Sequence, residues 1–442
     1  MKNKNLKIVM LGAGSGFVIP IAKDLQNNKF FHGAEFVLVD TNNDRLTAAE
    51  GYVKNITGNT ITVSATADRA RAFSGADYVI TSCEMNRYAN WSKDISIPER
   101  HGVHQVKGEN GGPGGLIHAL RNIAMFEPII ADMDRLCPDA WLLNFTNPMS
   151  ILCTYFKNYS RINTLGFCHQ VHGSFGVIAE MLGHPPGEIE VFSAGINHCN
   201  WLFDVRYKNT GKSCLDEFLK KVRESKYWHE KKPNIPDQRF TLEVLETFGM
   251  YPVGYDDHII EYFPFFWEQK EWKEKDYESL AETYRELSTK KTGTLEATQL
   301  LGKEFVKPPF PVDPNHPYYA ENPCAVIHSL ETNTPQYFDA INIPNNGAIS
   351  NLPDDVIVDV PAVAIAGQVR SIHAGALPIG PLEICRRQIT LHEMIAKAGA
   401  EGNTSLALQA LCLDPYVRSI TQARAILADY LREYKEYLPK FR

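Results

Sequence analysis

The 442-residue sequence lacks the features that define several large classes of protein. No apolar run reaches the roughly 20 residues that a membrane-spanning helix needs. The short apolar run near the N-terminus passes directly into a glycine-rich turn, which favours a first strand over a signal peptide. The formal net charge of −7 leaves no basic stripe for a phosphate backbone. We therefore expect a cytoplasmic protein with no membrane partner and no nucleic-acid partner.

A disulfide framework is also not expected. The nine cysteines are irregularly spaced and odd in number, so we predict reduced thiols that are mostly buried. A reduced cysteine can serve as a metal ligand. The sequence shows no internal repeat and no low-complexity linker, and the proline-rich segment 307–314 is the one plausible flexible excursion.

The length of the chain predicts two domains. Residues 1–195 alternate strand and helix patterns, which predicts an α/β fold with an N-terminal Rossmann-type doubly wound parallel sheet. Residues 196–442 are expected to form a C-terminal α+β domain. In that part, residues 340–347 and 356–361 are expected to be strands of a second sheet, residues 215–227 and 276–288 are expected to be helices, and residues 381–438 are expected to be helical.

A nucleotide site is predicted at the start of the chain. A buried-strand pattern over residues 6–11 leads into the turn that contains Gly12, Gly14 and Ser15, and a helical pattern follows. Glycines let backbone N–H groups approach a pyrophosphate, and the helix N-terminus supplies positive potential. Phe17 occupies the place of the third glycine in the usual fingerprint. Asp40 ends the next strand, where an acid can bind the ribose hydroxyls and repel a 2′-phosphate, so NAD is favoured over NADP.

Further strand patterns over residues 77–82, 140–145 and 161–167 continue the parallel sheet. The carboxyl ends of parallel strands line the ligand crevice of such a fold. Asn147 follows one of these strands and Cys168 follows another. Both side chains are therefore expected to lie near the nucleotide.

A metal site is one interpretation of the segments that contain Cys168 and His198. Cys168 is followed by His169, and His198 is preceded by Asn197. A soft thiolate and an imidazole from separate segments can share a divalent metal and leave positions open for a substrate. Ordinary packing of a cysteine beside a histidine is the alternative that local sequence leaves open.

Two more segments are dense in functional residue types. Residues 107–115 contain Glu109 among five glycines and a proline, a composition that predicts a loop leading into a helix after Leu116. Residues 251–258 end in consecutive polar side chains before an aromatic run, and in isolation they read as a solvated loop. Those polar side chains are Tyr255, Asp256, Asp257 and His258.

Taken together, the sequence resembles the NAD-dependent glycoside hydrolases of family 4 over nearly its whole length. The segments that carry the resemblance, in order, are Gly12-Ala13-Gly14-Ser15, Glu109 with Gly112-Pro113-Gly114-Gly115, residues 144–148, Cys168-His169, Ala194-Gly195-Ile196-Asn197-His198 and Asn351-Leu352-Pro353. The resemblance implies a fold like that of the lactate and malate dehydrogenases. It separates this chain from those enzymes, which lack the metal-binding cysteine.

The resemblance implies a hydrolase that uses NAD and a divalent metal, usually manganese. NAD would remove hydride from C3 of the sugar, a base would take the proton at C2, and the leaving group would depart by elimination before water adds and C3 is reduced again. Cys168 and His198 match the metal ligands. Asn147, Asn197 and His258 are the expected sugar-binding side chains.

His169 indicates the branch of the family. Branches that act on 6-phosphorylated sugars are expected to carry Asn or Asp after the metal-binding cysteine, whereas Cys-His resembles the branches that act on unphosphorylated α-glycosides. The C-terminal part looks most like the α-galacturonidases, with α-galactosidases and α-glucosidases as the alternatives. A uronate needs a cation for its carboxylate, and Arg370 or His373 could supply one.

The catalytic residues remain open at the level of sequence. The family pattern places the C2 base on Tyr255, whereas alignment on the following histidine favours Asp256 or Asp257. Glu109 and His169 are both candidates for the general acid. A 2-hydroxyacid-type dehydrogenase and a non-catalytic nucleotide-binding regulator are the alternative functions. We expect a small carbohydrate substrate and a homodimer or homotetramer.

Overall fold

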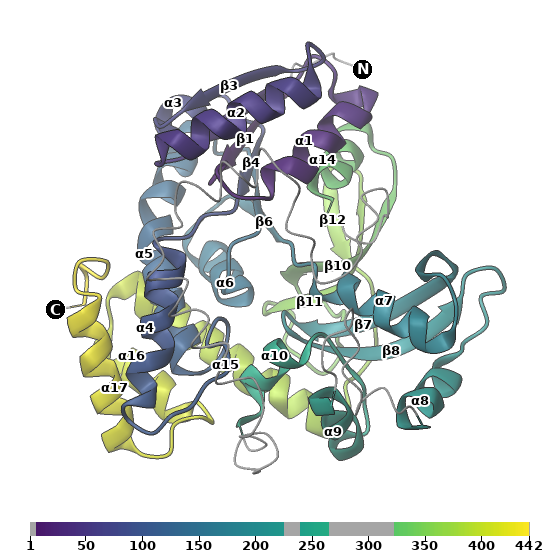
Figure 1. Cartoon of the computed structure of the whole chain (residues 1–442), viewed down its shortest axis with the longest axis vertical. Helices are drawn as coiled ribbons and strands as arrows, with labels where there is room; N and C mark the ends of the chain where they lie inside the picture. Colours follow the sequence, from purple (N-terminus) through teal and green to yellow (C-terminus); the bar gives the residue numbers. More distant parts are fainter. Residues whose placement is uncertain (1–5, 225–238, 265–321, 442) are drawn as a thin grey trace.

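The computed structural model describes residues 6–224, 239–264 and 322–441, and these form one mixed sheet covered by helices (Figure 1). Six parallel strands make the first half of the sheet, in the spatial order β3-β2-β1-β4-β5-β6. Their bounds are β1 Lys7–Leu11, β2 Glu35–Val39, β3 Thr62–Thr66, β4 Tyr78–Thr81, β5 Trp141–Asn144 and β6 Asn163–Gly166. This is the strand order of a doubly wound dinucleotide-binding sheet. The expected Rossmann-type fold is confirmed.

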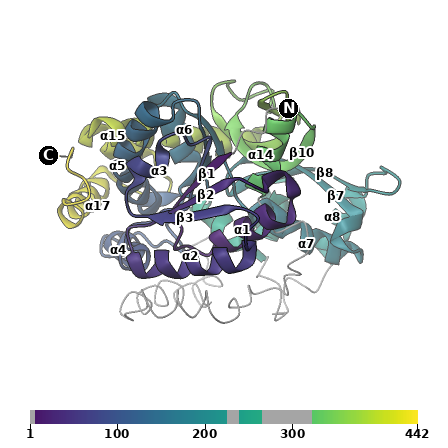
Figure 2. The same cartoon turned by 90° about the horizontal axis from the view of Figure 1, so that it is seen from above.

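Helices cover both faces of this half. Figure 2 shows α1 (Val18–Asn27) and α2 (Asn43–Thr57) on one side of β1–β3, and α3 (Arg69–Phe73), α5 (Gly112–Leu136) and α6 (Met149–Tyr159) on the other. The strands β1, β2 and β4 are short, largely apolar runs because both of their faces are covered. In β1, for example, Ile8, Val9 and Met10 are fully buried.

The later strands continue the same sheet. β10 (Gln336–Pro344) pairs antiparallel with β6 through Asn342 and Gly166. The order then runs through β11 (Ile357–Ile365), β7 (Ile189–Ile196), β8 (Cys199–Tyr207) and β9 (Pro252–Val253), with β12 (Gln368–Ser371) beside β11. The expectation of a second sheet for residues 340–347 and 356–361 is therefore wrong. The open edge of β6 needs backbone partners, and β10 supplies one.

The remaining helices surround the two halves of the sheet. They are α4 Arg87–Glu99, α7 Gln170–Leu182, α8 Leu215–Glu224, α9 Arg239–Phe248, α10 Asp256–Ile259, α14 Pro323–Thr332, α15 Ile379–Glu401, α16 Thr404–Leu413 and α17 Ile420–Glu433. The helical C-terminal part is confirmed as the three helices α15–α17. The helix expected over residues 276–288 and the proline-rich segment 307–314 lie outside the described residues. Within the described chain, no helix is both long and apolar enough to cross a membrane.

The glycine-rich segment 107–115 departs from the sequence expectation. Helix α5 begins at Gly112, inside the glycine run and not after Leu116, and Pro113 lies in its first turn, where its missing N–H is tolerated. The glycines permit close backbone contact: a Cβ at Gly115 would lie 2.5 Å from the carbonyl carbon of Asn110. The loop before α5 is thereby packed tightly against the start of the helix.

Candidate active site

The turn after β1 has the geometry of a phosphate cradle. Gly12 has a φ of +76°, and a Cβ there would lie 2.1 Å from the carbonyl oxygen of Ser82, so glycine is required. The backbone N–H of Gly14 donates to Oδ2 of Asp40 at 2.9 Å. The hydroxyl of Ser15 is buried and has no hydrogen-bond partner among the described residues. A phosphate oxygen of NAD would supply such a partner, so these residues fit the expected cofactor.

Asp40, Phe17 and Asn147 lie around this turn. Asp40 follows β2, and its Oδ1 accepts the backbone N–H of Asn42 at 2.8 Å. Phe17 precedes α1 and packs on Phe145 with ring centroids 5.3 Å apart, which explains how an aromatic residue replaces the third glycine. Asn147 follows β5, and its buried Oδ1 has no hydrogen-bond partner in the described chain. All three lie at the carboxyl-terminal edge of the parallel strands.

Cys168 and His198 meet in the structure. Cys168 follows β6 and is half-buried, and its Sγ lies 3.2 Å from Nε2 of His198. A metal bound to both would have bonds of about 2.3 Å to sulfur and about 2.1 Å to nitrogen, which this separation allows. The thiol and the imidazole therefore fit a shared divalent cation.

His198 is fixed by the turn between β7 and β8. It is 3% exposed, and its φ of +64° is left-handed, a conformation that costs a non-glycine residue roughly 1 kcal/mol or more. Asn197 completes the turn, and its carbonyl oxygen accepts the hydroxyl of Tyr262 at 3.1 Å. The hairpin thus directs one imidazole edge toward Cys168.

The imidazole of His198 is in the form that binds metals. Burial lowers its pKa well below the ordinary value, and its neighbours His258 and Lys107 lower it further. A neutral imidazole is the ligand form. Nδ2 of Asn110 lies 2.8 Å from Nδ1 of His198. Rotating that amide by half a turn would place its oxygen there as the acceptor of Nδ1–H, which leaves Nε2 with the lone pair for a metal.

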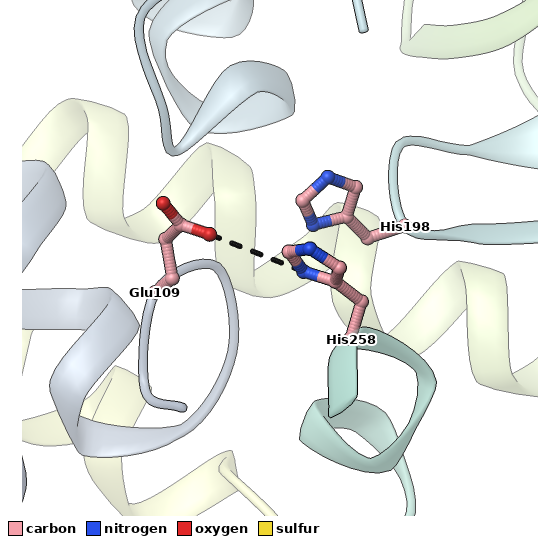
Figure 3. Close-up of side chains that lie close together, drawn as sticks. All are labelled: Glu109, His198 and His258. Atoms are coloured by element: carbon pink, nitrogen blue, oxygen red, sulfur yellow. Dashed lines mark ion pairs between the residues drawn. The ribbon is translucent and has the colours of Figure 1, made fainter. Parts of the chain in front are cut away.

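His258, Glu109 and His198 form a compact group that draws on three separate parts of the chain (Figure 3). Nδ1 of His258 lies 3.9 Å from Oε2 of Glu109, and the two imidazole centroids are 3.8 Å apart. The three side chains bring ligand atoms within 4.8 Å of one another. Nε2 of His258 lies 2.8 Å from Nζ of Lys107. Since an ammonium only donates, Nε2 of His258 accepts and Nδ1 carries the ring proton, with Oε1 of Glu261 at 3.5 Å as its nearer carboxylate oxygen, so neither ring nitrogen offers a free lone pair to a metal.

Glu109 is a buried carboxylate surrounded by cations. Burial by itself raises the pKa of Glu109, but the charges of Arg87 and Lys107 outweigh it and lower that pKa to about 2. NH2 of Arg87 lies 3.0 Å from Oε1 of Glu109. Glu109 is therefore ionised at neutral pH.

Tyr255 and Asp256 are adjacent in sequence but have different surroundings. Asp256 is 2% exposed, and its carboxylate accepts the backbone N–H groups of Phe240 and Thr241, each at 2.9 Å, and the Thr241 hydroxyl at 2.7 Å. It therefore caps the first turn of α9. The hydroxyl of Tyr255 packs against Gly173, where an added Cβ would lie 2.1 Å away. That position is in the first turns of α7, the helix that begins just after Cys168.

The segment 251–258 is not a solvated loop. Tyr251, Val253 and Asp256 are buried, and β9 pairs with β8. Sequence alone did not show this pairing. The side chain of Asp257 lies outside the described residues.

Three predicted residues are not part of the buried group formed by Glu109, His198 and His258. His169 precedes α7 and is exposed. Arg370 lies exposed on β12, and its guanidinium donates to Oε1 of Gln368 at 2.8 and 3.1 Å. His373 is exposed as well. No contact in the described chain joins Arg370 or His373 to Glu109.

Other residues of the site were not predicted from the sequence. Lys107 and Asn110 lie in the glycine-rich segment already singled out, so their nearness to Glu109 was a usable signal. Glu261 follows His258 by three positions, a spacing that places two side chains on one face of a helical turn. Arg87 has no local pattern that marks it.

The fold is a doubly wound sheet with a glycine cradle, and its strand ends also bring a thiol and an imidazole together. These features define the class of dinucleotide-binding enzymes with a metal centre. The pattern of the family 4 glycosyl hydrolases matches residues 7–184, and the pattern of their C-terminal domain matches residues 193–417. The chain belongs to family 4 of the glycosyl hydrolases and is a glycoside hydrolase. The resemblance inferred from the sequence is confirmed. NAD and a divalent metal are the cofactors of this family.

Three relatives of known activity are similar over nearly their full lengths. An α-glucosidase from Erwinia rhapontici is 31% identical, with 92% of this chain and 93% of the relative covered. An α-galacturonidase from Bacillus subtilis is 29% identical, with 93% and 94% covered. An α-galactosidase from the same species is 28% identical, with 99% and 100% covered.

Solved structures show the same fold. The Bacillus subtilis protein lplD is 26% identical with a TM-score of 0.82, covering 97% of this chain and 100% of that one. A 6-phospho-α-glucosidase from gut microorganisms, solved with NAD and Mn²⁺, is 20% identical with a TM-score of 0.79, covering 99% and 100%. Malate dehydrogenase from Plasmodium falciparum is 13% identical with a TM-score of 0.51, covering 91% and 99%. The expected likeness to the dehydrogenase fold is confirmed.

Proposed function

We propose that this chain hydrolyses unphosphorylated α-glycosides, with α-galacturonides as the first candidates and α-galactosides or α-glucosides next. The observation that carries the proposal is the contact between Cys168 and His198, because a dehydrogenase of the same fold does not need a metal-binding thiol. Relatives named for glucosides, galactosides and galacturonides lie between 28% and 31% identity. Overall identity therefore does not select the sugar.

The proposed class of substrate is supported by His169 and by the cations near the site. Cys168 is followed by a histidine, as in the branches that act on unphosphorylated sugars. A galacturonide brings a carboxylate that needs a cation. Arg370 and His373 make no contact with the buried group in the described chain, whereas Arg87 lies 3.0 Å from Glu109. Arg87 is thus the better-supported partner for a uronate.

The cofactors would be held by two sets of residues. Gly12, Gly14, Ser15 and Asp40, with Phe17 and Asn147 beside them, fit NAD, and Cys168 and His198 fit a divalent metal such as Mn²⁺. When bound, NAD supplies reversible hydride transfer at C3 of the sugar, and the metal supplies Lewis-acid polarisation of the O2 and O3 hydroxyls. The carboxylate of Asp40 disfavours a 2′-phosphate, which supports NAD over NADP.

We assign removal of the C2 proton to Tyr255. Asp256 has its carboxylate oxygens engaged by the first turn of α9. The hydroxyl of Tyr255 instead lies beside the helix that follows Cys168. These surroundings support the phenol as the base.

We assign protonation of the leaving oxygen to His169. Glu109 has a pKa of about 2 and therefore carries no proton to donate near neutral pH. His169 is an exposed imidazole next to Cys168, and imidazole is the side chain most often used for proton transfer by enzymes. Asn147, Asn197 and His258 are assigned to the sugar hydroxyls.

The test is hydrolysis of a nitrophenyl α-glycoside in D₂O with Mn²⁺, NAD and a reductant. We expect release of the aglycone, deuterium at C2 of the released sugar and no net NADH. Net NADH without aglycone release would favour the 2-hydroxyacid dehydrogenase instead. A panel of α-galacturonides, α-galactosides and α-glucosides then identifies the sugar, with the 6-phosphorylated glycosides as negative controls.

We also propose a homodimer or homotetramer, and a division of the chain into residues 1–195 and 196–442. Light scattering coupled to size-exclusion chromatography tests the first proposal. Limited proteolysis with identification of the fragments tests the second, because domain boundaries are preferred cleavage sites.

A further inference from the structure

A single buried carboxylate organises the loop that carries Glu109. Oε2 of Glu261 accepts three consecutive backbone N–H groups, from Glu109 at 2.8 Å, Asn110 at 2.6 Å and Gly111 at 2.9 Å. Glu261 is 2% exposed. Hydrogen bonds to an ionised acceptor are among the stronger ones in proteins. The loop and the turn that contains Glu261 are therefore held together tightly.

The turn that carries Glu261, residues 260–262, is itself anchored on several sides. The hydroxyl of Tyr416 donates to the carbonyl of Ile260 at 2.7 Å, and the guanidinium of Arg387 donates to the carbonyl of Tyr262 at 2.9 Å. A Cβ at Gly111 would lie 2.7 Å from the carbonyl oxygen of Glu261, so the two backbones are in direct contact. The position of this turn thus determines the position of the loop.

The loop in turn contacts the predicted metal ligand. The side-chain amide of Asn110 reaches Nδ1 of His198 at 2.8 Å. Partners of this kind on the distal nitrogen fix the orientation and tautomer of a metal-binding histidine. Asn110 does not ligate the metal through this arrangement, because it occupies the nitrogen that faces away from Cys168.

We propose that Glu261 is a positioning residue that acts through Asn110 on His198, and that this chain of contacts sets the affinity for the divalent metal. The proposal rests on the assignment of Cys168 and His198 as metal ligands under the proposed function. It assigns Glu261 no contact with substrate.

The experiment is a Mn²⁺ titration of the full-length protein without substrate, with free Mn²⁺ measured by electron paramagnetic resonance. Asn110→Ala removes the contact to His198, and Glu261→Asp shortens the side chain that holds the loop. Each is expected to weaken Mn²⁺ binding about 10- to 100-fold, the usual cost of losing such an outer partner. The double variant is expected to bind Mn²⁺ no less tightly than the single variant with the lower affinity, because both changes act on one chain of contacts.

Glu261→Gln and Asn403→Ala are the controls. Gln keeps one carbonyl oxygen to accept the three N–H groups, so its Mn²⁺ affinity should stay closer to native than that of Glu261→Asp. Asn403 caps α16 by accepting the N–H of Leu406, away from the site. Asn403→Ala should lower the melting temperature and leave Mn²⁺ affinity unchanged, which separates positioning from general loss of stability.

Three results would overturn the proposal: unchanged affinity in Asn110→Ala, multiplicative losses in the double variant, or no Mn²⁺ binding by the native protein. If Glu261→Asp does not fold, the Mn²⁺ affinity of Asn110→Ala alone still decides whether the contact to His198 sets metal affinity. Failure of the native protein to cleave any α-glycoside would refute the proposed function alone, because Mn²⁺ binding is measured without substrate.

Discussion

Sγ of Cys168 and Nε2 of His198 lie 3.2 Å apart, although they follow strands from different halves of the sheet. Cys168 comes after the last parallel strand, β6, and His198 comes from the antiparallel hairpin of β7 and β8. The contact exists only when both halves are assembled. The predictions below test this pair and the residues around it.

Cys168→Ser should abolish metal-dependent hydrolysis. A neutral hydroxyl is a much poorer ligand than an anionic thiolate, so Mn²⁺ affinity should fall by more than the 10- to 100-fold that outer partners cost. Activity and Mn²⁺ binding are measured side by side. Cys412→Ser, which changes an exposed thiol, is the matched control and should behave like the native protein. Retention of full activity in Cys168→Ser would remove the proposed metal site.

Tyr255→Phe should lower kcat while the fold stays intact. Loss of a positioned proton-transfer group typically costs about 10²- to 10⁴-fold in rate. Exchange of the C2 hydrogen in D₂O should fall in parallel, because the same group removes that proton. The melting temperature should change little, since the ring remains. Native exchange rates in Tyr255→Phe would transfer the role to another residue.

Asp256→Ala should act mainly on stability. The variant loses the hydrogen bonds to Phe240 and Thr241 at the start of α9, and loss of a helix cap costs roughly 0.5 to 2 kcal/mol. Urea unfolding measures the loss, and kcat at saturating cofactor is measured on the same sample. A large fall in kcat with unchanged stability would mean that Asp256, and not Tyr255, is the base.

Gly12→Ala should abolish NAD binding or prevent folding of the turn. The added Cβ would lie 2.1 Å from the carbonyl oxygen of Ser82 at a left-handed φ, so the backbone must move. NAD affinity is measured by calorimetry. Gly51→Ala is the matched control, because Gly51 lies inside α2 with no atom near its added Cβ, and alanine there should stabilise the helix by roughly 0.5 to 1 kcal/mol. Equal NAD affinities in the two variants would contradict the cradle.

Asp359→Asn should stabilise the protein at alkaline pH. Burial raises the pKa of Asp359 from 3.8 to about 7, and the nearby amide groups of Asn197 and Asn200 oppose that rise only in part. A raised pKa means that the folded chain keeps a proton that the unfolded chain has lost, so stability falls as pH rises from about 3.8 to about 7 and stays low above.

The variant removes this ionisation, so it should raise the melting temperature more at about pH 8 than at about pH 4. The corresponding difference in the free energy of unfolding is a few kcal/mol at most. Thermal denaturation at the two pH values measures the difference. An equal or smaller gain at the higher pH would show that Asp359 is not buried as an acid.

Local sequence was sufficient for the parallel half of the fold. The apolar runs of β1, β2, β4 and β5 and the glycine turn are short-range signals, and the rule for parallel strand ends then located Asp40, Asn147 and Cys168. The antiparallel half of the sheet was harder to predict from the sequence. The pairing of Asn342 with Gly166 joins positions far apart in the sequence, and no local pattern distinguishes it from a separate sheet.

The candidate site follows the same division. Cys168, His198 and Glu109 were identifiable because they lie in segments of unusual composition. The roles of Tyr255 and Asp256 were not separable, since neighbouring side chains point in different directions and only tertiary contacts tell them apart. Glu261 was missed because its partners lie 150 to 152 positions away.

Metal binding is expected to affect stability as well as activity, because of the junction between β6 and β10. The two halves of the sheet meet there through one backbone partnership, Asn342 with Gly166, while Cys168 and His198 stand on opposite sides of it. An ion held by both side chains is a reversible cross-link between the halves. At 100 times its dissociation constant such a ligand adds about 2.7 kcal/mol to the free energy of unfolding. The concentration of free metal would therefore determine the stability of the protein as well as its activity.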